Sequence, residues 1–118
     1  MPVTVLIVDD HPAFRASARR LLALDGFSVV GEAVDGESAL RLARELAPEV
    51  VLLDIGLPDR SGFDVAVELA RLQTKVVLVS SRAQADLGRR VVQSGALGFI
   101  SKERLSGETI VALLERAA

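Results

Sequence analysis

Five short apolar runs, each followed by a longer amphipathic stretch, limit most strongly how this chain can fold. The runs are VTVLIV (3–8), FSVVGEAV (27–34), EVVLLD (49–54), KVVLVS (75–80) and ALGFIS (96–101). They are rich in Val, Leu and Ile without strict alternation, which is typical of strands covered on both faces of a parallel sheet. Five strand-and-helix pairs with short connections predict an α/β fold with a doubly wound, five-stranded parallel sheet.

The stretches between the runs have the apolar spacing of covering helices. In the first, Phe14, Ala18, Leu21 and Leu22 recur at helical spacing, and the arginines Arg15, Arg19 and Arg20 lie on the opposite face. Gly26 is expected to end this helix and Pro48 to block the second. The predicted helices cover Pro12–Leu24, Gly36–Leu46, Ser61–Leu72, Ala83–Ser94 and Ser106–Ala117. The fourth has the weakest pattern, because Gly88 interrupts a thin apolar stripe, and we expect it to be the most mobile helix.

Composition excludes several classes of protein. The 118 residues suit one compact domain spanning 1–118, and half of them are apolar. No cysteine is present, which excludes disulfides and thiolate metal sites and is compatible with the reducing cytoplasm, where we expect the chain to act. The apolar segment Val3 to Val8 is too short for a signal peptide or a membrane span. A net charge of −2 gives no general attraction to nucleic acid, so any DNA contact would need another domain.

Polar side chains stand where the predicted strands end. Asp9 and Asp10 end the first strand, Asp54 the third, Ser80 with Ser81 the fourth, and Lys102 follows the fifth. In doubly wound folds ligands sit at the carboxyl ends of the strands, so these groups are expected to converge. Three crowded carboxylates repel one another unless a cation offsets them, and Mg²⁺ prefers carboxylate oxygens, water and phosphate oxygens. The sequence therefore predicts a magnesium site.

Each of these aspartates could instead cap a helix or a turn, which is a common role for this residue type. Capping does not, however, require an adjacent acidic pair, a third acid two strands later and a lysine. The set as a whole therefore favours a site.

The motifs VLIVDDHPAFR, EVVLLDIGLPDRSGFD, VVLVSS and GALGFISK resemble those of response-regulator receiver domains, the CheY-like family, in the same order and over the whole chain. The resemblance implies a (βα)5 flavodoxin-like fold with strand order 2-1-3-4-5. It also implies a switch in a two-component system rather than an enzyme, with only self-phosphorylation and slow autodephosphorylation.

By this resemblance Asp54 is the phosphoacceptor for a phosphohistidine on a sensor histidine kinase. Asp10, Asp54 and the Gly56 carbonyl would bind Mg²⁺, with Asp9 acting largely through water. Lys102 would contact the phosphoryl group, Ser80 would be the switch hydroxyl and Phe99 the aromatic that follows it, so that the surface of the fourth helix, fifth strand and fifth helix changes. Ser81 is secondary and could be a helix cap. Gly56 and Arg82 occupy positions that influence the lifetime of the phosphoryl bond.

Two details depart from the commonest receiver pattern. Glu103 follows Lys102 where most receivers have a cis proline, so a trans peptide is expected. DDHP and SKERL resemble receivers that precede LuxR-type helix-turn-helix domains, so we expect an effector domain that regulates transcription to follow residue 118 in a longer regulator, and a homodimer on activation. His11, the only histidine, is interpreted as a loop residue near the site.

Three other functions make different demands on the sequence. A phosphatase of the haloacid-dehalogenase type needs an Asp-x-Asp after the first strand, whereas Asp9 and Asp10 are adjacent. A dinucleotide-binding domain needs a glycine-rich first turn, which VDDHPAF lacks. A degenerate receiver that docks without phosphorylation is distinguished by whether Mg²⁺ binds.

Overall fold

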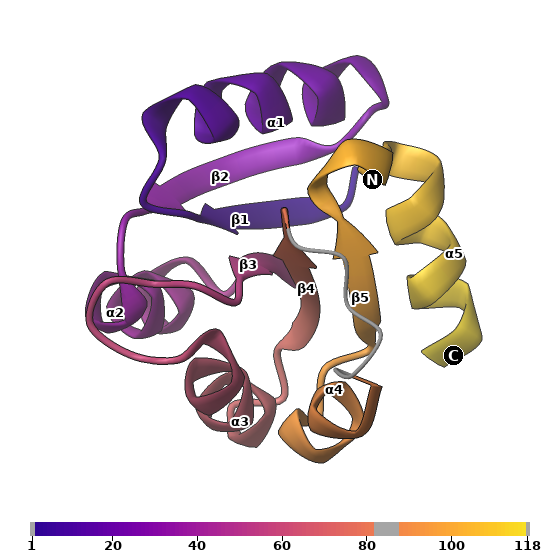
Figure 1. Ribbon diagram of the computed structural model, residues 1–118. Helices are drawn as coiled ribbons and strands as arrows, with labels where there is room; N and C mark the ends of the chain where they lie inside the picture. Colours follow the sequence, from indigo (N-terminus) through magenta and orange to yellow (C-terminus); the bar gives the residue numbers. More distant parts are fainter. Residues whose placement is uncertain (1, 82–87, 118) are drawn as a thin grey trace.

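The computed structural model of the chain describes residues 2–81 and 88–117. Strands and helices alternate along it (Figure 1). The strands are β1 (Thr4–Val8), β2 (Ser28–Ala33), β3 (Val50–Asp54), β4 (Lys75–Ser80) and β5 (Gly98–Ser101). The helices are α1 (Pro12–Leu24), α2 (Gly36–Leu46), α3 (Gly62–Arg71), α4 (Gly88–Ser94), the 3₁₀ turn η1 (Lys102–Arg104) and α5 (Gly107–Ala117). All strand pairs are parallel in the order β2-β1-β3-β4-β5, which confirms the predicted fold. Residues 83–87 of the predicted fourth helix lie outside the described residues.

The sheet lies between two layers of helices, with α1 and α5 on one face and α2, α3 and α4 on the other (Figure 1). Because both faces are covered, every residue of β3 is buried, and so are five of the six residues of β4. Two apolar clusters result. Ala18, Leu22 and Ile110 belong to the cluster on the α1/α5 face, and Ala39, Phe63, Leu69 and Val91 to the cluster on the other. The continuous apolar runs are thus explained by burial on both sides.

The first two helices end where the sequence predicts. Gly26 follows α1 with a φ of +90°, in the left-handed region that glycine enters without strain. α2 stops at Leu46, and Ala47 takes a left-handed conformation before Pro48. The longest α-helix has 13 residues, and none in the described ranges has the length and apolar character needed to span a bilayer.

Two helix N-termini are capped from distant loops. The carboxylate of Asp25, in the loop after α1, accepts a hydrogen bond of 2.7 Å from the amide of Gly107 at the start of α5. Asp59, between β3 and α3, accepts bonds of 2.8 and 3.1 Å from the amides of Gly36 and Glu37 at the start of α2. These bonds satisfy amides that a helix cannot satisfy itself, and each ties a loop to the helix that it caps.

Strand register brings the acidic residues to one place. β1 pairs with β3 up to Val8 and Leu53, so the next residues along the two strands are Asp9 and Asp54. β4 continues the edge, with Asp54 opposite Val79, and Ser80 then pairs with Ser101, the residue before Lys102. The side chains singled out from the sequence therefore meet because parallel strands end at the same edge.

Candidate functional site

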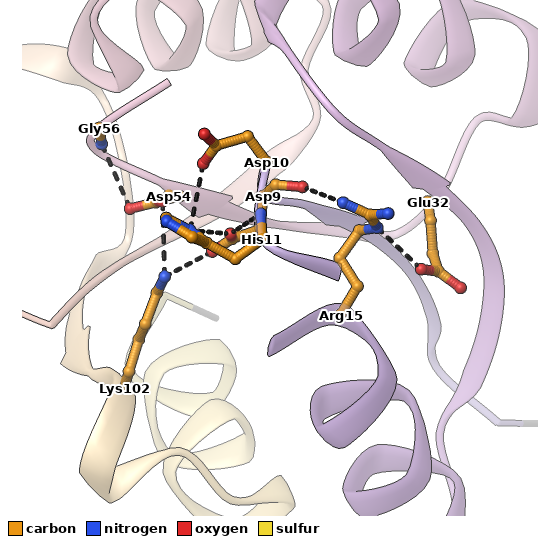
Figure 2. A network of polar contacts seen from close by, with 8 residues as sticks. All are labelled: Asp9, Asp10, His11, Arg15, Glu32, Asp54, Gly56 and Lys102. Carbon is orange, nitrogen blue, oxygen red and sulfur yellow. Dashed lines mark hydrogen bonds and ion pairs between the residues drawn. The ribbon is translucent and has the colours of Figure 1, made fainter. Parts of the chain in front are cut away.

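Asp9, Asp10, His11 and Asp54 form a compact cluster at the carboxyl edge of the sheet (Figure 2). One side-chain nitrogen or oxygen from each lies within 4.8 Å of those of the other three. Asp9 is fully buried, and Asp54 is 5% exposed. Asp54 Oδ1 accepts a hydrogen bond of 3.2 Å from the Gly56 amide. Charged groups this crowded and this shielded from water interact strongly.

Lys102 supplies the positive charge beside these carboxylates. Its Nζ lies 2.6 Å from Asp9 Oδ2 and 3.5 Å from Asp54 Oδ2 (Figure 2). The same ammonium group stands 4.3 Å from the centre of the Phe14 ring, a cation–π contact that adds to its placement. The 3₁₀ turn η1, directly after β5, aims the side chain at the cluster. The predicted convergence of Asp9, Asp54 and Lys102 is therefore observed.

The two buried carboxyl groups differ in their electrostatics. Burial, followed by the charge of Asp9, raises the pKa of Asp54 above its ordinary value. Burial also acts to raise the pKa of Asp9, but the Lys102 ammonium and hydrogen bonds from His11 outweigh it and hold that pKa below its usual range. The negative charge of Asp9 is thus balanced by groups of the protein itself, whereas the negative charge of Asp54 is balanced only in part.

His11 is the residue before α1 and contacts both neighbouring acids. Its amide donates to Asp9 Oδ1 at 2.8 Å. Its ring Nδ1 lies 2.9 Å from the same oxygen and 3.2 Å from Asp10 Oδ1. The ring is 65% exposed, so it forms the outer wall of the cluster. A loop position near the site is what the sequence predicted for this residue.

A cavity of about 490 Å³ opens over Asp54. Ser80, itself buried, and the exposed Ser81 line it together with Gly56 and Lys102. Phe99 instead lines a neighbouring cavity of about 640 Å³ between β5 and α5, and Ser81 lines both cavities. Among the described residues, Ser81 is therefore the one that lines both the site and the β5–α5 face. Arg82 lies outside the described residues.

Gly62 explains the shape of the loop that follows Asp54. A Cβ at this position would lie 2.4 Å from the Asp54 carbonyl oxygen, closer than real atoms approach. The Gly62 amide donates to the Ile55 carbonyl at 2.8 Å, which folds the loop back on the strand. Gly56, in the same loop, has open space where a Cβ would be. The glycine of the RSG sequence therefore allows α3 to start directly against β3.

Three arginines near the site were not predicted to lie there. Arg60 and Arg90 line the cavity, and Arg90 stacks 4.2 Å from the centre of the Phe63 ring. Arg15, which helical spacing assigned to the solvent face of α1, is only 16% exposed and donates to the Asp9 carbonyl at 2.8 Å. Its position four residues after His11 makes this contact possible, because it places the side chain over the turn that carries the acids, but the sequence alone does not decide whether the contact forms.

The donor set fits a magnesium ion. Asp9, Asp10 and Asp54 offer carboxylate oxygens, the ligands that hard divalent cations prefer, with the Gly56 carbonyl in the adjoining loop. Three acids face one ammonium group, so the cluster has room for further positive charge. No cysteine is available to favour a softer metal.

Comparison with known proteins identifies the family. The sequence profile of the response regulator receiver domain matches residues 5–115, nearly the whole chain. The chain belongs to this receiver domain family. The family is one of signalling switches in two-component systems, and its members share the fold described above.

Relatives of this receiver domain include response regulator GacA of Pseudomonas aeruginosa, 42% identical over 85% of this chain and 48% of that protein. Among solved structures, the NarL signal receiver domain of Mycobacterium tuberculosis is 37% identical, with a TM-score of 0.86 over 98% of this chain and 96% of that one. A DNA-binding response regulator of the LuxR family from Staphylococcus aureus is 26% identical, with a TM-score of 0.83 over 97% of each chain. The chain spans about half the length of the curated relatives it matches.

Proposed function

We propose that this receiver domain is a phosphorylation-dependent switch in which Asp54 accepts a phosphoryl group from a sensor histidine kinase in the cytoplasm. The observation that carries this proposal is the convergence of three carboxylates and Lys102 beside a cavity open to a phosphodonor. Among the three, Asp54 is the acid at the floor of that cavity.

The transfer follows from the residues present. An Asp54 carboxylate oxygen attacks the phosphorus of the phosphohistidine, the oxygen–phosphorus bond forms, and the phosphorus–nitrogen bond breaks. The imidazole nitrogen leaves with the electron pair and is protonated. Such a transfer depends mainly on positioning and charge neutralisation. Lys102 provides a compact positive charge on the side of Asp54 where the phosphoryl group would sit.

Asp10, Asp54 and the Gly56 carbonyl would hold Mg²⁺ directly, with Asp9 acting through water. When bound, the ion neutralises charge on the phosphoryl oxygens and on the carboxylates. Asp9 keeps its ion pair with Lys102, which suits a role outside the direct ligand set. Without a cation, the charge of Asp9 opposes ionisation of Asp54, the form that acts as nucleophile.

The output is a change of surface. A phosphoryl group adds negative charge at Asp54 and three acceptor oxygens, and Ser80, on the neighbouring strand and lining the same cavity, would bond to it. Phe99, which lines the neighbouring cavity between β5 and α5, would move after Ser80, and the face formed by α4, β5 and α5 would repack. Ser81 borders both cavities and has a secondary role, as would Arg82.

The effector is proposed from the relatives. The matched regulators are about twice the length of this chain, and the S. aureus relative is a DNA-binding regulator of the LuxR family. The domain, residues 1–118, would thus control a DNA-binding module that regulates transcription, dimerising when phosphorylated. Its own net charge of −2 gives it no general affinity for DNA.

Labelling by acetyl phosphate tests the proposal. With Mg²⁺ the purified chain should gain the mass of one phosphoryl group, located at Asp54 by peptide mapping. Asp54→Asn and removal of Mg²⁺ by EDTA should each abolish the gain. Asp59→Asn, in the same loop but holding α2 instead of the cluster, is the matched control and should still be labelled. Unchanged labelling of Asp54→Asn would refute the assignment, and a wild type that binds no Mg²⁺ would favour docking without phosphorylation.

A further inference from the structure

Arg15 links the acidic cluster to the edge strand of the sheet. From the first turn of α1, one guanidinium nitrogen donates to the main-chain carbonyl of Asp9 at 2.8 Å. Its Nε donates to Oε1 of Glu32, on β2, at 3.1 Å (Figure 2). The side chain is 16% exposed, so most of it is packed between the helix and the sheet. A planar, largely buried guanidinium bonded in two directions has a defined orientation.

Glu32 is held by two arginines of α1, of which only Arg15 reaches the cluster. Arg19, one helical turn later, donates from Nε to Oε2 of Glu32 at 2.8 Å and is 48% exposed. The hydrogen bond from Arg19, and then that from Arg15, keep the pKa of Glu32 below its usual range. Glu32 therefore stays ionised and anchors Arg15. The two arginines share the same anchor and differ in the bond to Asp9, which makes Arg19 a natural control.

The bond to the Asp9 carbonyl supports the turn between β1 and α1, in addition to the His11 amide, which donates to Asp9 Oδ1. The Asp9 amide donates to the Ala33 carbonyl at 3.0 Å, as the last bond of the β1–β2 ladder. Beyond that point the chain leaves the sheet, and His11 makes no side-chain cap for α1. Arg15 holds the peptide group between Asp9 and Asp10 from the other side. Without that bond, ψ of Asp9 and φ of Asp10 would be less restrained, and with them the direction in which the Asp10 carboxylate leaves the backbone.

We infer that Arg15, anchored by Glu32, is a positioning residue that sets the spacing of the Asp9 and Asp10 carboxylates for a divalent cation. This inference rests on the proposed function. Mg²⁺ requires near-ideal octahedral geometry, so small shifts of its ligands lower its affinity. Groups that orient metal ligands without touching the metal typically change affinity by about 10–100-fold when removed. Arg15 does not contact the phosphoryl group, so its loss weakens the binding of metal more than it weakens transfer at saturating metal.

Calorimetric titration with Mg²⁺ tests the inference. Arg15→Gln should raise the Kd for Mg²⁺ at least about tenfold, and labelling by acetyl phosphate should recover most of its extent when Mg²⁺ is raised to saturation. Arg19→Gln, which leaves the bond to Asp9 in place, should change the Kd less than about twofold, within the range of surface substitutions. Arg15→Lys keeps the charge but lacks the two-way geometry, and should not restore the affinity.

Glu32→Gln provides a second variant in case Arg15→Gln folds poorly. It keeps the size of the side chain, weakens the anchor, and should shift the Mg²⁺ affinity in the same direction as Arg15→Gln. Amide chemical shifts of Asp10 and His11 in metal-free protein should move in the Arg15 and Glu32 variants and stay in place in Arg19→Gln. Three results would each overturn the inference, provided that the wild type is still labelled. They are a wild-type Mg²⁺ affinity in Arg15→Gln, a loss of Mg²⁺ affinity in Arg19→Gln as large as in Arg15→Gln, and a full return of the affinity in Arg15→Lys. A wild type that neither binds Mg²⁺ nor is labelled would overturn the proposed function as well.

Discussion

The ammonium group of Lys102 lies 2.6 Å from Oδ2 of Asp9, closer than its 3.5 Å separation from Oδ2 of Asp54. In the unphosphorylated domain the lysine is therefore paired mainly with an acid other than the proposed acceptor. This arrangement keeps the fully buried Asp9 ionised, and it leaves Lys102 within a short movement of a group attached to Asp54. A cation bound at the cluster would stand close to this ammonium group, and the two positive charges would repel each other.

Replacing Lys102 should change metal binding and phosphorylation in opposite directions. Lys102→Met removes this positive charge, so Mg²⁺ should bind more tightly, whereas labelling by acetyl phosphate at saturating Mg²⁺ should slow at least about tenfold because charge neutralisation is lost. Without Mg²⁺, the unpaired Asp9 charge should lower the free energy of unfolding by about 3 kcal/mol. Lys75→Met, at the exposed start of β4, is the control and should affect none of the three. Weaker Mg²⁺ binding by Lys102→Met would contradict this account.

The raised pKa of Asp54 predicts a gain in stability when its charge is removed. Burial and then the charge of Asp9 raise this pKa, so the folded chain binds the proton more tightly than the unfolded chain, whose value is near 3.8. The free energy of unfolding therefore falls as pH rises from the unfolded value through the folded one. In EDTA at pH 7, Asp54→Asn should unfold with about 1 kcal/mol more free energy than wild type.

That gain should shrink as the pH falls through the raised pKa of Asp54 toward 3.8, because the folded wild type then takes up a proton at this position and loses the unfavourable charge. Urea unfolding between pH 4.5 and 8 measures it, with the exposed Glu49→Gln as a control for the loss of one charge. With Mg²⁺ the wild type should become the more stable of the two. Binding of the ion stabilises the wild type by about 2.7 kcal/mol at a hundredfold excess over its Kd, whereas the variant has lost one of the metal ligands. If Asp54→Asn were less stable than the wild type in EDTA, the folded protein would stabilise the Asp54 carboxylate charge, which would contradict this prediction.

The convergence at the carboxyl edge could be predicted from the sequence because it depends on only two facts. Asp9, Asp54 and Ser80 each end an apolar run, and parallel strands end at a common edge. The role of Arg15 could not be predicted this way. Helical spacing placed it with Arg19 on the solvent face, but a long side chain in the first turn can reach back over the sheet, and only the packing of α1 determines whether it does.

The caps formed by Asp25 and Asp59 could not be predicted from the sequence either. Each carboxylate accepts hydrogen bonds from amides more than twenty residues away in the sequence, and the separation between Asp25 and Gly107 is 82 residues. Local patterns identify capping residues only when the cap precedes its own helix, as Asp35 does for α2. Which loop approaches which helix end is a property of the assembled layers.

The two glycines of the loop after Asp54 should respond differently to alanine. Gly62→Ala introduces a Cβ 2.4 Å from the Asp54 carbonyl oxygen, so β3 and α3 must separate, and the free energy of unfolding should fall by roughly 2–3 kcal/mol. Gly56→Ala meets no atom within 4 Å, and this glycine does not have a positive φ, so the change should be within about 0.5 kcal/mol. Urea unfolding of both variants measures the difference. Equal tolerance at the two positions would mean that the loop is free to move away from the strand.

The bond between Asp25 and Gly107 should stabilise the start of α5 in particular. Asp25→Ala removes the acceptor for the first amide of that helix and should cost about 1 kcal/mol, the usual loss for a cap, whereas Asp25→Asn keeps an acceptor oxygen and should retain most of it. Hydrogen exchange should accelerate at the first turn of α5 in Asp25→Ala and stay unchanged in α2, whose cap is Asp59 together with Asp35. Faster exchange throughout the chain would indicate a general loss of stability instead.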